Sequence, residues 1–281
     1  MLVALLGVLV TASTLAIGGV SIASTLAAPA LGCTVALLAG TLLHAHGSRR
    51  GRSRDRGVFA RYVSSSIARE ILAPRAHDDA PLGSTREVSV LFADLRGFTR
   101  MATTMPADEL VRQLNECLEV LVASIEGRAG TVDKFLGDGV MAFFGAPSDQ
   151  PDHAARVCAA ARDMVAGMNR LNASRALRGL QPIAIGVGVA SGTAVVGSVG
   201  TRRRLEYTVI GAPVNLAARL EASSKQLGVA VVFDAATARA APDVPCVELG
   251  PIHVRGIARP VEVATLLELA PSWADVSRDA A

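Results

Sequence analysis

The sequence predicts an α+β domain in which helices cover an antiparallel sheet, behind a long apolar N-terminal segment. Between residues 85 and 268, segments typical of strands and helices follow one another in the order strand, helix, hairpin, helix, strand. This stretch is long enough to bury one hydrophobic core. Residues 1–48, in contrast, contain no Asp, Glu, Lys or Arg, although 19% of the whole chain is charged.

The apolar segment at residues 1–48 is long enough for two membrane-spanning helices, each of which needs about 20 mostly apolar residues. We expect a transmembrane hairpin with spans Leu2–Val20 and Ile22–Leu43, and we expect Pro29 to interrupt the apolar run. A secretory signal would have a positive amino-terminal region and a shorter apolar core. A lipoprotein cleavage site at Cys33 is a second alternative, although Ala30 fits it poorly.

Five arginines and one aspartate follow at residues 49–56 and give this stretch a net charge of +4. A basic cluster directly after a span stays cytoplasmic and is attracted to anionic lipid. We therefore expect a multi-pass protein of the inner (plasma) membrane with its domain in the cytoplasm. The whole chain carries +3, which leaves −1 from Gly57 onward and gives no indication of nucleic-acid binding.

Residues 49–84 are expected to link the membrane segment to the domain, and residues 269–281 to form a C-terminal tail. Apolar side chains recur at steps of three and four within Val58–Ala73, which predicts a helix that ends before Pro74. Such a stripe is typical of plain packing, and a parallel dimer contact is the alternative. The cysteines lack CxxC spacing, so we expect reduced thiols and neither a disulfide framework nor a zinc site. They are Cys33, Cys117, Cys158 and Cys246.

Within the domain, each element is predicted from its local pattern. The run EVSVLFA (87–93) has the β-branched and aromatic content of a buried strand. Leucines and valines on one face predict a helix over Ala107–Glu126, and a second helix is expected over Asp152–Leu171. The glycines at 137 and 139 predict a tight hairpin. Further strands are expected at 130–135, 139–145, 183–192, 193–200, 206–210 and 261–267, with a hairpin after residue 192 and a helix from Pro213.

Two carboxylates stand where such a sheet would bring them together. Asp94 follows directly on the buried strand, and Asp138 occupies the tip of the glycine hairpin. If these elements are neighbours, both side chains project at one edge, where they could hold a hard divalent cation that bridges phosphates. A capping aspartate and a turn aspartate are the alternative reading.

Four motifs in a fixed order are more specific than the carboxylates alone. They are VLFADLRGFT (90–99), GTVDKFLGDGVMAFFGAP (130–147), GVGVASGTAVVGSVG (186–200) and YTVIGAPVNLAARLE (207–221). Together they resemble the catalytic domain of the class III nucleotidyl cyclases, over roughly Arg86 to Leu267. The resemblance implies a ferredoxin-like βαββαβ fold and a signalling lyase that makes a cyclic nucleotide.

The resemblance also implies roles for individual residues. Asp94 and Asp138, with the Leu95 carbonyl, match the ligands of two Mg²⁺ or Mn²⁺ ions. Lys134 and Thr208 match the pair that reads the purine. A lysine suits the N1 acceptor of adenine and a threonine can accept from its amino group, whereas guanine would want an acceptor at Lys134, so ATP is the expected substrate.

The remaining implied residues handle the ribose and the phosphates. Asn215 matches the residue that orients the ribose, and Arg219 the one that stabilises the pentavalent phosphorus. The two are four apart on a predicted helix and hence on one face. Arg255 stands where the family usually has a lysine on the terminal phosphates, and Phe98 and Thr99 of the first motif are further substrate-binding candidates. In place of the family's usual acidic residue the chain has Ala212-Pro213, for which we expect only an effect on helix capping.

Class III sites lie between two subunits, one giving the metal ligands and the other the base and ribose contacts. Because this chain carries both sets, the resemblance implies a symmetric homodimer with two sites. Two alternatives remain: a guanylate cyclase, which Lys134 and Thr208 disfavour, and a silent cyclase-like module for dimerisation or nucleotide sensing. A diguanylate cyclase would need a GGDEF-type turn, which LGDGV (136–140) is not.

Overall fold

A 14-residue strand, β1 (Gly83–Arg96), lies at the centre of the sheet. The computed structural model describes residues 67, 83–201 and 203–270. β1 pairs along its whole length with β4 (Ala184–Thr201) and over its second half with β3 (Gly139–Phe144). Its side chains Val88 and Val90 are fully buried, as the pattern of the EVSVLFA run predicts.

In the described part of the chain the sheet has eight strands in the order β2-β3-β1-β4-β6-β8-β7, with β5 paired to β4. The segment from β1 to β4 runs strand, helices, hairpin, helix, strand, and its order β2-β3-β1-β4 is the ferredoxin-like arrangement that was expected. The other strands are β2 (Thr131–Leu136), β5 (Arg204–Ile210), β6 (Val231–Asp234), β7 (Cys246–Ile252) and β8 (Val261–Leu266).

The prediction of a purely antiparallel sheet is wrong at one pair, because β6 runs parallel to β4. After the β4–β5 hairpin the chain crosses the sheet in a helix, α7 (Ala212–Ser224), before it enters β6. A crossover of this kind returns the chain in the same direction, as parallel pairing requires.

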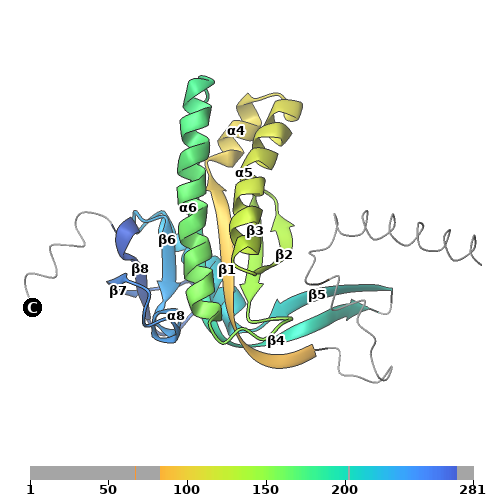
Figure 1. Ribbon diagram of the computed structural model, residues 1–281, viewed down its shortest axis with the longest axis vertical. Coiled ribbons are helices and arrows are strands. Elements are labelled where there is room, and N and C mark those ends of the chain that lie inside the picture. Colours follow the sequence, from red (N-terminus) through yellow and green to blue (C-terminus); the bar gives the residue numbers. More distant parts are fainter. Residues whose placement is uncertain (1–66, 68–82, 202, 271–281) are drawn as a thin grey trace, which may run out of the picture. The chain divides into compact units, whose positions relative to one another are not determined.

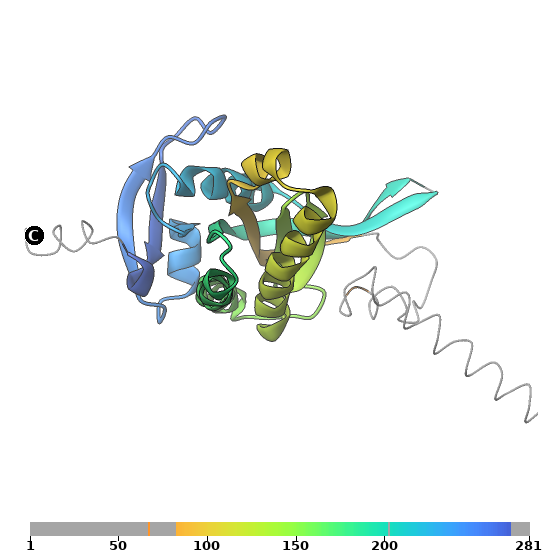
Figure 2. The same cartoon turned by 90° about the horizontal axis from the view of Figure 1, so that it is seen from above.

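Helices cover both faces of the sheet (Figures 1 and 2). α5 (Ala107–Gly127) and α6 (His153–Leu177) pack on one face against side chains such as Leu91, and α7 packs on the other against side chains such as Val90. This split follows from the alternation of side chains along β1. Both helices predicted before β4 are therefore confirmed, and α6 continues beyond Leu171 to Leu177.

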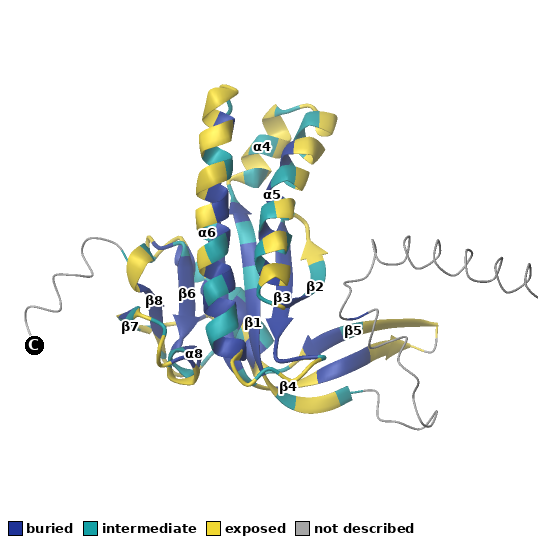
Figure 3. Cartoon of the chain, viewed as in Figure 1, coloured by how far each residue is buried: buried dark blue, intermediate teal, exposed yellow. Residues whose placement is uncertain are grey.

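Two short helices escaped prediction, α4 (Phe98–Thr104) and α8 (Ala235–Ala240). Neither is long enough to show a clear period of 3.6 residues. The hairpin expected after residue 192 is also wrong: β4 runs unbroken to Thr201, because both of its halves stay paired with β1. The chain turns after Thr201 instead, and β5 with the outer half of β4 forms an arm whose tip is exposed (Figure 3).

Several expectations fall on residues that the structure does not describe. These are the transmembrane hairpin at residues 1–48, the basic stretch at 49–56, most of the predicted linker helix and the tail beyond residue 270. Ile67, the described residue of that linker, is helical. Among the described residues, no helix combines the length and the apolar character needed to cross a bilayer.

The described cysteines Cys117, Cys158 and Cys246 are free thiols, which agrees with the expectation of reduced cysteines. Burial raises the pKa of Cys117 to about 11 and that of Cys158 to about 12. Both side chains are therefore protonated and act as small apolar groups of the core.

A chain of buried polar groups crosses the interior. The Ser89 hydroxyl contacts His153 Nδ1 at 2.7 Å and the Ser191 hydroxyl at 2.6 Å. Ser191 then meets the Thr237 hydroxyl at 2.8 Å, which donates to Asp234 at 2.6 Å. Burial lowers the pKa of His153, so its ring is kept neutral at physiological pH. These hydrogen bonds connect α6, β1, β4, α8 and β6. Each of the five polar side chains in this network has a hydrogen-bond partner.

α7 lies so close to β4 that the strand can carry no side chain at the contact. A Cβ placed on Gly188 would be 2.1 Å from the Glu221 backbone nitrogen and 2.2 Å from the Ala217 carbonyl oxygen. Those neighbours are backbone atoms of the helix and cannot rotate away. The glycine therefore fixes the distance between α7, which carries Asn215 and Arg219, and the sheet.

We predict that Gly188→Ala lowers the free energy of unfolding by about 3 kcal/mol, because the added methyl group overpacks the contact with α7. Chemical denaturation of the full chain, followed by helix circular dichroism, measures the change. Gly127→Ala is the matched control, since a Cβ there meets nothing within 4 Å. It should stay within about 1 kcal/mol of the wild type. Equal stability of the two variants would contradict the close packing of α7 on β4.

Candidate active site

Asp94 and Asp138 come together at one edge of the sheet. Asp94 lies near the end of β1 and Asp138 in the turn between β2 and β3, while the pairing of Ala93 with Val140 aligns the two elements. Burial raises the pKa of Asp94, and the neighbouring Asp138 carboxylate raises it further, whereas the Leu95 backbone N–H lowers it by hydrogen bonding. The structure thus supplies the juxtaposition on which the metal-site hypothesis depends.

Glycine again makes the approach possible. A Cβ on Gly139 would lie 2.9 Å from Asp94 Oδ1 and 2.8 Å from the Ala93 carbonyl oxygen. Packing therefore requires a glycine after Asp138, in addition to the requirement of the tight turn. Any larger residue at this position would collide with the Asp94 carboxylate.

A third carboxylate, Glu221 of α7, faces the same pair and was not predicted. Burial raises its pKa to about 7, Asp94 and Asp138 raise it as well, and Arg96 opposes them. The Arg96 guanidinium donates to the Ser224 hydroxyl at 3.0 Å and to the Val229 carbonyl at 2.7 Å, which holds it beside the helix. No feature of the sequence separated Glu221 from an ordinary helical glutamate, because its role follows from the position of α7.

The Asp94–Asp138 pair fits the hard divalent cations that the resemblance implies. Two carboxylates within reach of one another repel, and a cation between them relieves that repulsion. Mg²⁺ is usually held by one or two carboxylates together with water and substrate phosphates. In the described part of the chain, no group of three His, Cys, Asp or Glu side chains is arranged as a complete metal site. Asp94 and Asp138 could supply two carboxylate ligands to such an ion.

Lys134 and Thr208, the predicted base-reading pair, also come together, through a residue that the sequence analysis passed over. The Thr208 hydroxyl donates to Asp133 Oδ2 at 2.5 Å, and Lys134 Nζ lies 3.6 Å from Asp133 Oδ1. Lys134 also donates to Glu206 of β5 at 2.8 Å. The strand register shifts between Val132 and Lys134, so Asp133 is the extra residue of a β-bulge.

The two ends of the hairpin therefore serve different neighbours. Lys134 contacts β5, whereas Asp138 lies beside Asp94 of β1, although Lys134 and Asp138 are only four positions apart in the chain. Among the described residues, hydrogen bonds and ion pairs place Lys134 in one cluster, and the electrostatic interaction of Asp138 with Asp94 and Glu221 places it in another. We call these the metal cluster (Asp94, Asp138, Glu221, Arg96) and the base cluster (Asp133, Lys134, Glu206, Thr208).

The ribose and phosphate candidates lie on α7 and in the loop between β7 and β8. Asn215 is exposed, and Arg219 is half-buried. A Cβ on Gly256 would lie 3.1 Å from Arg219 Nη2, so the Arg219 guanidinium rests against the loop that carries the exposed Arg255. The helix begins at Ala212 with Pro213 in its first turn, as expected for the departure from the family pattern.

The two remaining candidates open α4. Thr99 is exposed, while Phe98 is partly buried and packs against the core. Phe98 therefore has a packing role that accounts for its position without a ligand.

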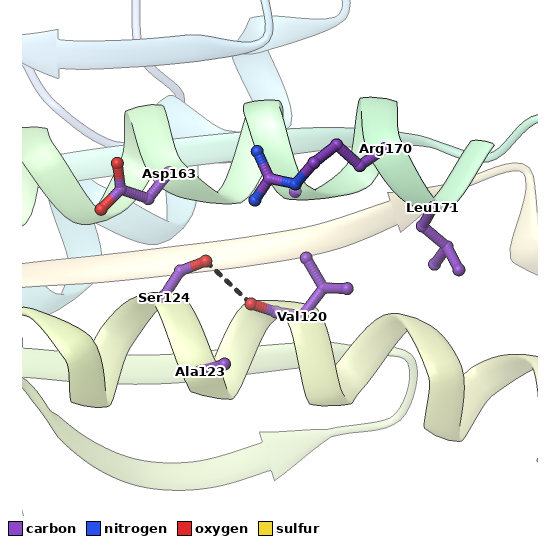
Figure 4. Close-up of a pocket in the computed structure, with 7 residues that line it drawn as sticks. Val120, Ala123, Ser124, Asp163, Arg170 and Leu171 are labelled. Atoms are coloured by element: carbon purple, nitrogen blue, oxygen red, sulfur yellow. Dashed lines mark hydrogen bonds between the residues drawn. The ribbon is translucent and has the colours of Figure 1, made fainter. Parts of the chain in front are cut away.

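A groove of about 560 Å³ between α5 and α6 contains none of the predicted site residues (Figure 4). Its Ser124 hydroxyl donates to the Val120 carbonyl at 2.8 Å, and its Asp163 pairs with Arg128 at 2.7 Å. The Ser124 hydroxyl and the Asp163 carboxylate of this groove are thus engaged within the protein.

Comparison with known proteins agrees with this geometry. The family model of the adenylate and guanylate cyclase catalytic domain matches residues 81–267. An uncharacterised Mycobacterium bovis protein is 36% identical over 222 residues, which cover 77% of this chain and 37% of that protein. An uncharacterised Mycobacterium tuberculosis protein is 38% identical over 172 residues, 61% of this chain and 30% of that protein. The chain thus spans about a third of the length of these curated relatives.

Several solved structures that resemble this chain are nucleotide cyclases. The adenylyl cyclase CyaB from P. aeruginosa is 33% identical with a TM-score of 0.62, over 66% of this chain and 95% of that one. The guanylyl cyclase Cya2 is 32% identical with a TM-score of 0.60, over 69% and 98%. A bacterial light-regulated adenylyl cyclase shares the fold, with a TM-score of 0.69 at 22% identity over 83% of this chain and 67% of that one. With two thirds of its length matched by the family model, this chain belongs to the family of adenylate and guanylate cyclase catalytic domains.

Proposed function

We propose that this chain is an adenylate cyclase that converts ATP to 3′,5′-cyclic AMP and pyrophosphate. The base cluster is the observation that carries the choice of ATP. Lys134 offers a donor to the N1 acceptor of adenine, and Thr208 can accept from the 6-amino group. Guanine presents a hydrogen on N1 and an acceptor at position 6, so it would meet the wrong group at both places.

The pairing of Lys134 with Glu206 is compatible with this role. Glu206 is 47% exposed on its side chain and Lys134 36%, so solvent screens the pair and its contribution is small. The ammonium also has three donors, of which Glu206 uses one at a time. Lys134 can therefore turn a donor toward a base without leaving the cluster.

The chemistry follows from the residues of the metal cluster and α7. Asp94 and Asp138 would hold the divalent ions, which when bound lower the pKa of the ribose 3′-hydroxyl and neutralise phosphate charge. Asn215 would orient the ribose so that its 3′ oxygen is in line with the α-phosphorus. The new oxygen–phosphorus bond forms as the bond to pyrophosphate breaks, and the hydroxyl proton leaves. Arg219 would offset the negative charge that develops on the phosphorus, and Arg255 that of the departing phosphates.

We further propose that each active site is shared between two copies of the chain. Exposed segments lie on the arm and on β2 (Figure 3). They include large apolar side chains that are 38–53% accessible, and such exposed apolar surface is typical of an interaction site. A second copy that covers this surface would also bring one chain's base cluster to the other's metal cluster. These side chains are Phe135, Leu136, Val195, Val199, Leu205 and Ile210.

Anchoring in the inner membrane through residues 1–48, with the domain in the cytoplasm, remains part of the proposal and rests on the uncharged apolar composition of that segment. A guanylate cyclase is the second candidate, because Cya2 is a guanylyl cyclase and is as similar to this chain as CyaB is. The donor at Lys134 is the feature that favours ATP over GTP.

The direct test is an assay of the full 281-residue chain with ATP and with GTP, each with Mg²⁺ and with Mn²⁺. We expect cyclic AMP as the main product and a kcat/KM for ATP at least about tenfold above that for GTP, because two hydrogen bonds distinguish the bases. Cyclic GMP as the main product would contradict the proposal, and no cyclic product with either metal would favour the silent module.

Asp94→Asn and Asp138→Asn should each lower turnover by at least about 100-fold, because each removes a charge that holds the ions. In EDTA neither variant should melt below the wild type, since the change relieves repulsion within the metal cluster. The rise in Tm that Mn²⁺ gives the wild type should be lost. Asp163→Asn, which removes a surface carboxylate from α6, is the control and should keep both turnover and the Mn²⁺ response. An unchanged Mn²⁺ response in Asp94→Asn would disprove the metal assignment.

Two inactive variants should restore activity to each other if sites are shared. Asp94→Ala destroys the metal half of a site and Asn215→Ala the ribose half, so in a mixed dimer both lesions fall in one site and the other is intact. With random pairing about half of the dimers are mixed, so activity should return to about one quarter of the wild-type value per subunit. The measurement is cyclic AMP formation by differently tagged, co-expressed variants. Proven mixed dimers that stay inactive would place the whole site within one chain.

A further inference from the structure

The side chain of Asp133 is buried within the base cluster, with 2% of it accessible. Three donors surround its carboxylate: the Thr208 hydroxyl at 2.5 Å, the Val209 backbone N–H, and Lys134 Nζ at 3.6 Å. The β-bulge at this position on β2 brings the carboxylate to the two β5 residues. Asp133 is thus the link between the strand that carries Lys134 and the strand that carries Thr208.

Burial raises the pKa of Asp133 above its ordinary value, and the surrounding donors and the Lys134 charge offset part of that rise. A buried carboxylate is costly unless it is paired, and here each donor favours its ionised form. An ionised carboxylate only accepts hydrogen bonds. The Thr208 hydroxyl must therefore be the donor in its contact with Asp133.

A hydroxyl has one hydrogen and two lone pairs. Because the hydrogen of Thr208 is held by Asp133, the side chain can offer a ligand only its lone pairs. It can then accept from the 6-amino group of adenine but cannot donate to the 6-oxo group of guanine. Without Asp133 the hydroxyl would rotate and could serve either base.

We propose that Asp133 is a specificity-determining positioning residue, which selects ATP over GTP by fixing Thr208 as a hydrogen-bond acceptor. This inference rests on the proposed cyclase function and deepens it. Lys134 reads N1, and Asp133 acts on the second contact, at position 6, without touching the base itself. The preference for adenine thus depends on the β-bulge at Asp133 and on the contact between β2 and β5, in addition to the two base-reading side chains.

The chain offers a matched pair of variants to test this. Asp133→Asn keeps the shape of the side chain, but its amide can donate to Thr208 and so free the Thr208 hydrogen for a 6-oxo group. Glu206→Gln also removes a carboxylate from Lys134, at 2.8 Å, yet Glu206 makes its side-chain bonds to Lys134 and Arg204 and none to Thr208. Only the first change alters the direction of the Thr208 hydrogen bond.

We expect Asp133→Asn to lower the ratio of kcat/KM for ATP over GTP by about tenfold in the full chain, since one hydrogen bond changes direction. Glu206→Gln should change this ratio by less than about threefold. In a Thr208→Val background, the addition of Asp133→Asn should leave the ratio unchanged, because the hydroxyl through which it acts is gone. Binding of 3′-deoxy-ATP and 3′-deoxy-GTP, measured by calorimetry, should show the same shifts without turnover.

If Asp133→Asn leaves the ratio of kcat/KM for ATP over GTP at the wild-type value, the inference is overturned. The proposed function would still stand in that case, provided that the wild type prefers ATP. An equal fall in Glu206→Gln would also overturn it, because the effect would then act through the Lys134 charge. A wild type with no ATP preference would overturn both proposals.

Purine riboside triphosphate covers the case in which Asp133→Asn fails to fold. This nucleotide keeps N1 of adenine and lacks the 6-amino group, so it isolates the Thr208 contact. The wild type should use it about tenfold less well than ATP. Equal use of the two nucleotides would show that Thr208 accepts nothing from the base, and the inference would fail.

Discussion

The continuous pairing of β1 with β4 is the constraint on which the rest of the structure depends. The register from Gly83↔Gly197 to Arg96↔Ala184 leaves no break along β1. Paired residues of the two strands therefore direct their side chains to the same face of the sheet along its whole length. A slip of one residue would exchange the β1 side chains that face α5 and α6 with those that face α7, and so would disrupt both cores. The same register delivers Asp94 to the edge where the β2–β3 turn presents Asp138. Site and core are thus specified by one set of backbone hydrogen bonds.

Charge compensation separates the functional carboxylates from the structural ones. Asp133 and Asp234 are buried, and each accepts hydrogen bonds from a threonine hydroxyl and a backbone N–H. Asp94, Asp138 and Glu221 lie close together instead, and burial together with repulsion from the neighbouring carboxylates raises the pKa of Asp94 and of Glu221. A folded chain tolerates such repulsion where a ligand relieves it. The first kind of carboxylate is compensated within the protein, and the second kind is where we propose that a cation binds.

The sequence predicted those features that depend on local periodicity. The strand at 87–93 and the helices from Ala107 and near Asp152 have clear patterns and were correct. The ferredoxin-like order, which the family resemblance implied, was also correct. The unbroken course of β4 was not predictable, because Ser191-Gly192 looks like a turn unless the partner strand is known. The parallel β4–β6 pair has no local signature either, since the crossover by α7 sets its direction.

Some residues of the candidate site could be predicted from the sequence, and others could not. Asp94 and Asp138 could be proposed as partners on the condition that the buried strand and the hairpin are neighbours, and the β1–β3 pairing meets that condition. Asp133 could not, because a β-bulge arises from the pairing of two strands and shows no mark in one of them. Glu221 depends on the distance of α7 from the sheet, which Gly188 sets on another element. Tertiary contacts, unlike periodicity, cannot be read from one segment at a time.

The length of β4 has a mechanical consequence. One 18-residue strand belongs to the core at its start and to the arm at its end, with no loop between them. The metal cluster and the base cluster are therefore parts of a single stiff body, whose internal geometry a signal cannot easily alter. If two copies assemble as proposed, each contributes a prebuilt half of either pocket. The remaining freedom is the angle between the two subunits. A stimulus would therefore act on such an enzyme by changing how one rigid subunit is oriented on the other.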